Sequence, residues 1–424
     1  MENKILFGCL ADDFTGASDA ASFLTENGTR VILYNGIPDK NGIIEPNCQS
    51  VVIALKTRTE EKNMAVSQSL KAAKWLKNHG AKKLYVKYCS TFDSTKDGNI
   101  GPIVDAILEE YNVPYTILCP ALPVNKRIVK DGKLYVDGVL LHESPMSNHP
   151  LTPMWASEIK ILIEAQSKYR AFNLEMDELF GEKEKLFSKL KDLSRENKHF
   201  YLIPDYHETE HGEKIIDLFG DLPLLTGGSG LMSHIAKKFF NICEKTQNNP
   251  VEDKIQSGAV ILAGSCSVAT LSQIADYQKK GGKSYQIYPL KLMYGEQKLE
   301  DIISLMQSSD NLLIYSSAPS DEVKKVQANG KEKIAQMLEQ AMATIAAAAI
   351  ECGKYRIIVA GGETSGTITQ KLGFKSYLIG KSIAPGVPIM TPLKNNKIRL
   401  VLKSGNFGQE DFFTRALEMT GGQN

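Results

Sequence analysis

The sequence predicts an α/β protein with two lobes, each a mainly parallel sheet flanked by helices. Short apolar runs alternate with amphipathic helical patterns along almost the whole chain, and this alternation is typical of parallel strands joined by right-handed crossovers. The chain has 424 residues, whereas one domain usually has roughly 100–200 residues. A polar segment near the middle separates two such series, so we expect two domains.

The first half of the chain carries the elements of one lobe. Two Asp-Gly pairs lie inside a β-type pattern and predict a small antiparallel excursion near residues 127–141. A strand at 201–204, a glycine-rich segment at 227–230 and a helix ending near residue 240 complete this lobe. The earlier strands are expected at 5–10, 30–34, 51–55, 83–88 and 115–119, with helices at 15–27, 61–79 and 103–111.

The second half repeats the alternation after a polar interval. Residues 244–257 include a proline and almost no apolar side chains, which is typical of a linker. We therefore expect a first domain at 1–243, a linker at 244–257 and a second domain at 258–424. Beyond the linker, strands are expected at 259–263, 284–288, 311–315, 355–360 and 397–402.

The overall charge argues against two classes of partner. Lys and Arg total 50, Asp and Glu total 49, and the net charge is +1. No basic field is available to hold nucleic acid or an anionic membrane surface, so an anionic ligand needs a local pocket. No apolar run approaches the ~20 residues of a membrane span, and the N-terminal run is too short for a signal peptide.

Cysteine usage indicates the compartment. The seven cysteines are odd in number, scattered, and without a C-x-x-C pair. This pattern favours free thiols in a reducing environment over a disulfide framework or a structural zinc site. We therefore expect a cytoplasmic protein, and the oligomeric state, a homodimer included, is left open.

Glycine- and hydroxyl-rich turns follow several predicted strands, where open α/β sheets bind their ligands. Backbone N–H groups in such turns, together with the N-terminus of the following helix, can hold phosphate oxygens. Three turns of this kind in the second half favour a phosphate pocket over ordinary strand-to-helix connections. Its candidate residues are Ser265, Gly361, Gly362, Glu363, Thr364, Ser365, Gly366, Gly405, Asn406 and Gly408.

In the first half, Asp12 and Asp13 place adjacent carboxylates directly after the first strand. Such a pair can hold Mg²⁺ or a substrate hydroxyl, or it can cap the following helix, although capping explains only one of the two well. With Arg58, the segment after the fourth strand can clamp a carboxylate and a polyhydroxylated chain, unless it is simply a solvated loop. The residues of that segment are Lys87, Ser90, Thr91, Asp93 and Ser94.

Two short motifs resemble known nucleotide-binding and zinc-binding sequences. Residues 380–382 resemble the end of a P-loop, but the glycine required at position 375 is Lys375. His207, Glu208 and His211 match the zinc motif H-E-x-x-H, which in metalloproteases lies within a long helix. Here the motif starts just after a strand and a glycine follows it at once. We expect a chance match with both histidines at the surface, and a zinc hydrolase is a distant alternative.

Taken in order, these segments resemble the four-carbon acid sugar kinase family. The resemblance runs from residues 10–16 (LADDFTG) to 403–408 (KSGNFG). It implies an N-terminal sugar-binding domain and a C-terminal nucleotide-binding domain, with ATP, Mg²⁺ and a small sugar acid as ligands. Within the family, members that act on 3-oxo-tetronate are the most similar, and D-erythronate or D-threonate is the alternative substrate. The segments that carry this distinction are 89–94, 98–102, 120–125 and 148–154.

The reaction that the resemblance implies is phosphate transfer from ATP to the terminal C4 hydroxyl of the acid. The substrate would contact the candidates of the first half, and ATP those of the second. Arg58 or Lys87 would neutralise the substrate carboxylate, and Asp12, Asp13 or Asp93 would accept the hydroxyl proton, a choice that the sequence leaves open. A non-catalytic sugar-acid sensor, whose paired acids only cap a helix, is the remaining alternative.

Overall fold

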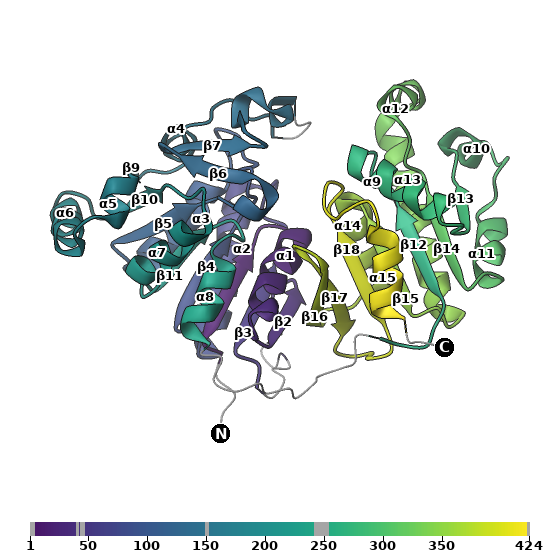
Figure 1. Cartoon of the computed structure of the whole chain (residues 1–424), viewed down its shortest axis with the longest axis horizontal. Helices are drawn as coiled ribbons and strands as arrows, with labels where there is room; N and C mark the ends of the chain where they lie inside the picture. The colour runs from purple at the N-terminus through teal and green to yellow at the C-terminus, as the bar shows by residue number, and fades with distance from the viewer. Residues whose placement is uncertain (1–4, 40–41, 43–46, 149–151, 241–253, 422–424) are drawn as a thin grey trace. The chain divides into compact units, whose positions relative to one another are not determined.

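The computed structural model describes residues 5–39, 42, 47–148, 152–240 and 254–421. The chain divides into two compact units, residues 1–245 and 246–424 (Figure 1). This boundary falls inside the segment expected to be a linker. Residues 244–253 of that segment lie outside the described residues, so its extent stays a prediction.

The first unit contains a parallel sheet in the order β2-β3-β1-β4-β11-β5-β10-β9. Its strands are short and nearly all their side chains are buried, because helices cover both faces. The strands are β1 (Phe7–Ala11), β2 (Val31–Asn35), β3 (Ser50–Ala54), β4 (Lys83–Lys87), β5 (Tyr115–Cys119), β9 (Arg170–Leu174), β10 (Phe200–Pro204) and β11 (Leu224–Gly227).

The strand order decides which face each helix covers. The chain moves in one direction from β1 to β2 and in the other from β3 to β4, so right-handed crossovers place α1 and α2 on opposite faces. Accordingly, α1 and α7 pack against α8, and α2 packs against α3. These helices are α1 (Phe14–Glu26), α2 (Lys62–Asn78), α3 (Ile100–Glu110), α7 (Thr209–Phe219) and α8 (Met232–Phe239).

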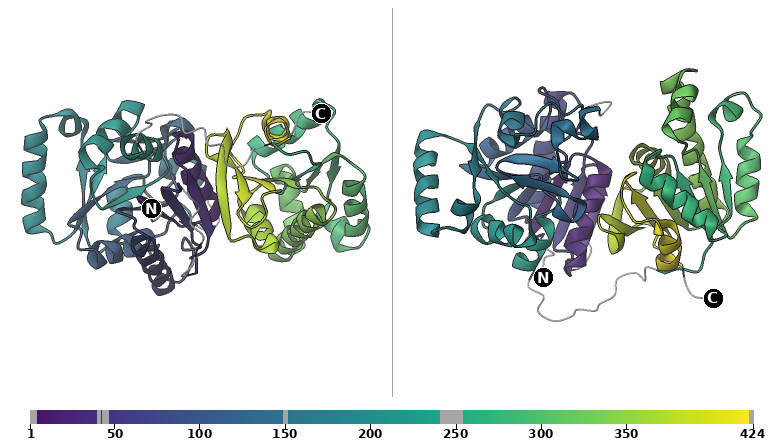
Figure 2. Two further views of the ribbon diagram at one scale, coloured as in Figure 1. Left: turned by 90° about the horizontal axis from the view of Figure 1, so that it is seen from below. Right: turned by 45° about the horizontal axis from the view of Figure 1, so that its top comes forward.

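The expected antiparallel excursion is confirmed as a separate small sheet, β6-β7-β8. Its two tight turns carry Asp131 and Asp137 with positive φ, each followed by a glycine that also has positive φ. The strands are β6 (Arg127–Lys130), β7 (Lys133–Val136) and β8 (Val139–Leu140). The remaining helices are α4 (Ile159–Glu164), α5 (Met176–Phe180) and α6 (Lys183–Glu196), of which α6 lies at the outer edge of this unit (Figure 2).

The second unit contains a sheet in the order β13-β14-β12-β15-β18-β17-β16. The strands from β13 to β18 in this order are parallel, whereas β17 is antiparallel to both of its neighbours. The strands are β12 (Ala259–Ala263), β13 (Ser284–Gln286), β14 (Asn311–Tyr315), β15 (Arg356–Ala360), β16 (Ser376–Ala384), β17 (Val387–Pro392) and β18 (Arg399–Lys403).

Helices again cover both faces of this sheet. Helix α13 packs against α11 and α14, while α9 packs against α15. A core of aliphatic strand residues and aromatic side chains of α15 fills the second of these layers, and each such side chain contributes roughly 1.5–3 kcal/mol on burial. The helices are α9 (Val268–Lys279), α10 (Pro289–Met293), α11 (Leu299–Gln307), α12 (Ser320–Gln327), α13 (Lys331–Glu351), α14 (Gly362–Leu372) and α15 (Phe412–Thr420).

These elements also decide the status of the motif at 380–382 and of the longest apolar run in the second unit. Residues 380–382 lie within strand β16, and not between a strand and a helix, so they form no P-loop. The apolar run at 341–350 belongs to helix α13. Within the described part of the chain, no helix combines the length and apolar character required to cross a bilayer.

Candidate functional site

The first candidate cluster lies at the carboxyl ends of β1, β3 and β4. These strands are adjacent and in register, with Ala11 opposite both Ala54 and Lys87. The residues that follow the strands therefore meet at one edge of the sheet. They line a cavity of about 20 Å³, which is room for one water-sized group. Its polar lining comprises Asp12, Thr57, Arg58, Ser69, Lys87, Tyr88, Asp93, Ser94 and Asn99.

Arg58 is surrounded by carboxylates. Its Nε donates to Asp12 Oδ2 at 2.8 Å and its terminal nitrogen donates to Asp12 Oδ1 at 3.0 Å, a bidentate pair. The guanidinium also lies 3.3 Å from Asp13 and 3.7 Å from Asp93. All three acids proposed as proton acceptors thus converge on one cation, whose charge is compensated within the protein.

Asp12 and Asp13 have different environments. Burial raises the pKa of Asp12, and the neighbouring charge of Asp13 adds to this effect while Arg58 opposes it. Burial also acts on Asp13, but the charges of Arg58 and Lys87 outweigh it, and the pKa of Asp13 is lowered. Neighbouring carboxylates whose pKa values are pushed apart can take different acid–base roles.

Asp13 is also the N-cap of α1. Its Oδ1 accepts from the Gly16 amide at 2.7 Å and its Oδ2 accepts from the Thr15 hydroxyl at 3.0 Å. A Cβ at Gly16 would lie 2.4 Å from Asp13 Oδ1, so the close approach requires glycine. The expectation that capping explains one of the two acids is confirmed, since Asp12 makes no such contact among the described residues.

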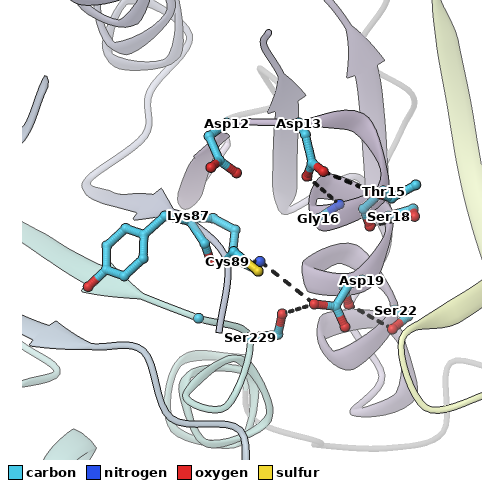
Figure 3. A network of polar contacts seen from close by, with 12 residues as sticks. Asp12, Asp13, Thr15, Gly16, Ser18, Asp19, Ser22, Lys87, Cys89 and Ser229 are labelled. Atoms are coloured by element: carbon cyan, nitrogen blue, oxygen red, sulfur yellow. Dashed lines mark hydrogen bonds and ion pairs between the residues drawn. The ribbon is translucent and has the colours of Figure 1, made fainter. Parts of the chain in front are cut away.

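Lys87 belongs to a buried network that reaches α1 and the glycine-rich segment (Figure 3). Its Nζ lies 3.7 Å from Asp19 Oδ2 and donates to the Tyr88 carbonyl at 3.0 Å. The Ser229 hydroxyl donates to the same Asp19 oxygen. Burial opposes the charge on Lys87, yet Asp19 and the other carboxylates outweigh it and raise the pKa of Lys87. Asp19 was not among the sequence candidates, because it reads as an ordinary polar residue inside a helix.

The segment after β4 is ordered by its own contacts. The Thr91 hydroxyl donates to Asp93 Oδ1 at 2.5 Å, and Phe92 has a φ of 53°. The Gln166 side chain donates to Ser94 Oγ at 2.9 Å. Asp93 and Ser94 line the cavity, whereas Ser90 and Thr91 do not.

Asn99 is a further residue that sequence reasoning missed. It is buried, lines the cavity, and donates through Nδ2 to the carbonyls of Thr57 and Glu60, both at 2.8 Å. It thereby holds the segment that carries Arg58. Residues 98–102 were singled out as a segment of the family resemblance, but Asn99 itself was not named as a site residue.

The second candidate cluster lies at the carboxyl ends of β12, β15 and β18. Ala360 is in register with both Ala263 and Lys403, so the three glycine turns meet at one edge of the sheet. The Ser265 hydroxyl lies against Gly405, where an added Cβ would come within 2.3 Å of it. Ser267 Oγ and Thr270 Oγ1 donate to the Gly405 carbonyl at 2.7 and 3.0 Å.

Gly361 is the N-cap of α14, and residues 362–366 lie in the first part of the helix. Gly361 has a φ of 136°, a backbone conformation that glycine adopts readily and other residues rarely do. A Cβ at Gly362 or Gly366 would meet nothing within 4 Å. Ser365 is fully buried, and its amide donates to the Gly361 carbonyl.

The later part of the third turn contacts the side chain of Gln273. Gln273 Nε2 lies 3.0–3.1 Å from three successive carbonyl oxygens, those of residues 407, 408 and 409, which share its two N–H donors. Gly408 has a φ of 84°, and Asn406 is exposed. Gln273 and Thr270 were missed because nothing in the sequence distinguishes them from other helix residues.

A cavity of about 210 Å³ adjoins these turns within the second unit. Its lining combines turn residues with apolar side chains of α12 and α13, which were not among the sequence candidates. Prominent lining residues are Gly264, Tyr288, Val323, Leu338, Met342, Glu363 and Thr364.

The H-E-x-x-H expectation is wrong in one respect. His211 is 2% exposed, so it is not a surface residue. Its Nδ1 accepts from the amides of His207 and Glu208, both at 3.3 Å, and this caps α7 together with the Glu208 side chain. Ligand atoms of Glu208, Glu210 and His211 lie within 4.8 Å of one another, but the capping contacts explain the pattern without a metal.

Comparisons with known proteins also distinguish an N-terminal and a C-terminal domain. Residues 7–235 match the family model described as a sugar-binding N-terminal domain, and residues 260–413 match a nucleotide-binding C-terminal domain. Proteins named 3-oxo-tetronate kinase from Haemophilus influenzae and Pseudomonas savastanoi pv. phaseolicola are each 38% identical. The alignments cover 98% of this chain and 100% and 98% of those proteins.

Two solved structures are similar over nearly the whole chain. A Haemophilus influenzae protein is 38% identical with a TM-score of 0.80, covering 97% of this chain and 99% of that one. A Salmonella typhimurium LT2 protein, proposed to be a tRNA synthase, is 37% identical with a TM-score of 0.87, covering 97% and 98%.

Proposed function

Because this chain belongs to the four-carbon acid sugar kinase family, we propose that it transfers the γ-phosphate of ATP to the C4 hydroxyl of 3-oxo-tetronate. The relatives that carry that name span this chain almost completely. The observation that carries the proposal is that each unit gathers its candidates at the carboxyl edge of its own sheet. One edge presents charged side chains, which suit a sugar acid, and the other presents glycine turns, which suit phosphates.

Asp12 is the proposed proton acceptor. Its raised pKa favours proton transfer more than the lowered pKa of Asp13 does, and Asp13 is already committed to capping α1. Arg58 holds Asp12 in a fixed orientation and remains the proposed contact for the substrate carboxylate, together with Lys87. Asp93 and Ser94 would contact substrate hydroxyls.

The second unit would hold ATP as its Mg²⁺ complex. Ser265, Gly405, Asn406 and the first turn of α14 would contact the phosphates through N–H and hydroxyl groups. The adjoining cavity of about 210 Å³, with its apolar wall, suits the adenosine moiety. The metal would arrive with the nucleotide, and we assign no protein side chain to it. Transfer needs the attacking oxygen within about 3–3.5 Å of the phosphorus, so positioning is the main catalytic task.

The remaining elements of the proposal concern setting and assembly. We place the protein in the cytoplasm, on the cysteine pattern and the use of ATP. The oligomeric state is left open, with a homodimer as one candidate. Light scattering coupled to size-exclusion chromatography would measure it.

An ADP-release assay over a panel of four-carbon acids tests the function. We expect the highest kcat/KM with 3-oxo-tetronate, and lower values with D-erythronate and D-threonate. A preference for either aldonate would correct the substrate and keep the reaction. If no acid stimulates ADP release although ATP and the acid both bind, the protein is a sensor and not a kinase. Stoichiometric zinc in the purified protein would revive the hydrolase alternative.

A further inference from the structure

Lys403 is a buried lysine that the proposed reaction has not used. It is the last residue of β18 and its relative exposure is 0%. Its Nζ donates to Gly405 O at 2.8 Å, and to Thr270 Oγ1 and Ser404 O at 3.1 Å. The ring of Phe412 lies 5.7 Å from the nitrogen. All three ammonium protons therefore have acceptors, but every acceptor is neutral.

No carboxylate compensates this charge within the described part of the chain. The surrounding elements carry charged residues that form no ion pair with Lys403 and contribute nothing to its pKa, which burial alone lowers to about 7. The corresponding cation of the first unit, Lys87, has Asp19 beside it. A buried charge without a counter-ion costs free energy. A lysine at this position therefore calls for a functional explanation. The charged residues on α9, β15, α14, β18 and α15 and in the turn before α15 are Asp276, Lys279, Arg356, Glu363, Lys371, Arg399, Glu410, Asp411, Arg415 and Glu418.

The location of Lys403 supplies that explanation. The Gly405 carbonyl accepts from Lys403, Ser267 and Thr270, and is thereby fixed toward the buried side of the turn. In a trans peptide the C=O and the following N–H point in opposite directions. The amide of Asn406 is therefore directed away from Lys403, toward the exposed side of the turn. The ammonium group thus both shapes the turn and lies directly behind it.

We infer that Lys403 is a positioning residue for the nucleotide phosphates, which fixes the Gly405 turn and provides the buried positive charge that a bound polyphosphate completes. This inference rests on the proposed ATP site and goes beyond it in two ways. It predicts that the contribution of Lys403 to affinity grows with the number of phosphates on the ligand. It also predicts that polyphosphate binding favours the ammonium form, so the protein takes up a proton when ATP binds near or above pH 7.

Isothermal titration calorimetry on the full chain tests both statements. Wild-type protein is titrated with ATP and adenosine at pH 7.5, in two buffers that differ in ionisation enthalpy. We expect proton uptake with ATP and none with adenosine. Lys403→Met should bind ATP at least tenfold more weakly, which corresponds to about 1.4 kcal/mol, bind adenosine as the wild type does, and show no uptake. Lys403→Arg should regain part of the ATP affinity without uptake, because arginine does not titrate here.

A matched control is available in the same unit. Lys354 is also buried, but it donates to the carbonyls of Ser309 and Asp310 at the amino end of the sheet. Lys354→Met should lower thermal stability and leave the ratio of ATP to adenosine affinity unchanged. In steady-state kinetics, Lys403→Met should raise KM for ATP and leave KM for the sugar acid unchanged.

The outcomes separate this inference from the proposed function. If the wild-type chain does not bind ATP, the proposed function fails first. If it binds ATP without proton uptake, the charge role of Lys403 is wrong, and this measurement needs no variant to fold. Equal losses of ATP and adenosine affinity in Lys403→Met would reduce the residue to a structural support.

Discussion

The two strand-end clusters present different chemical groups for binding an anionic ligand. In the first unit, Arg58 and Lys87 are already paired with carboxylates in the protein alone. In the second, Lys403 contacts only carbonyl and hydroxyl oxygens, and backbone turns replace charged side chains. The cations of the first site thus have carboxylate partners before a ligand arrives, whereas the cation of the second has none among the described residues. The predictions below test this difference, from the largest expected effect to the smallest.

Asp12→Asn should have the largest effect. Removal of a general base lowers turnover by roughly 10²–10⁴-fold, and the change leaves the second unit untouched. We expect kcat to fall by that amount with an unchanged Kd for ATP. Asp93→Asn is the matched comparison, because Asp93 also approaches Arg58 but at 3.7 Å. A larger loss in Asp93→Asn would transfer the proton-acceptor role to Asp93.

Arg58→Ala should raise KM for the sugar acid and spare KM for ATP. A hydrogen bond to a charged group contributes about 1.5–3 kcal/mol, which corresponds to a KM increase of roughly 10- to 100-fold. Because Asp12 loses its bidentate partner, kcat should fall as well. Arg58→Lys keeps the charge without the fork and should recover only part of both losses. Steady-state kinetics with each substrate varied in turn provides the measurement. Equal changes in both KM values would place Arg58 at the phosphate, and unchanged values would return it to a structural role.

Gly362→Val should weaken ATP binding about tenfold or more while the fold stays intact. An added Cβ would meet nothing in the protein within 4 Å, so we expect the branched side chain to clash with a bound phosphate and not with the fold. Gly362→Ala, with a smaller side chain, should show an intermediate loss. Kd values from calorimetry and melting curves without ligand separate binding from folding. Unchanged ATP affinity in a folded variant would remove this turn from the site.

His207→Ala combined with His211→Ala should leave kcat and both KM values near those of the wild type. The buried position of His211 and its capping bonds now predict a loss of stability of about 1 kcal/mol, as for other helix caps. Thermal melting and kinetics of the same preparation provide the comparison. A loss of turnover in a protein that melts normally would contradict the structural role.

The sequence was sufficient to predict the fold class, because strand–helix alternation specifies parallel sheets. It also indicated which segments lie at the carboxyl edge of each sheet. It could not reveal which residues support them. Asp19, Asn99 and Gln273 act through contacts with segments far away in the chain, and no local pattern marks such contacts. The burial of His211 was missed for the same reason. The antiparallel pair β16 and β17 was also not predicted. Its segment was considered only for its resemblance to the end of a P-loop at residues 380–382.

Strand β11 has a consequence for how the first unit is made on the ribosome. It lies between β4 and β5, yet it comes from residues 224–227, more than a hundred residues after both. Until it emerges, the inner edges of β4 and β5 carry unpaired backbone groups, a known cause of aggregation. Lys87 ends one of these strands, so its surroundings also form late. A nascent chain that stops before Leu224 should therefore need chaperone protection, and the first site becomes competent only once β11 has inserted.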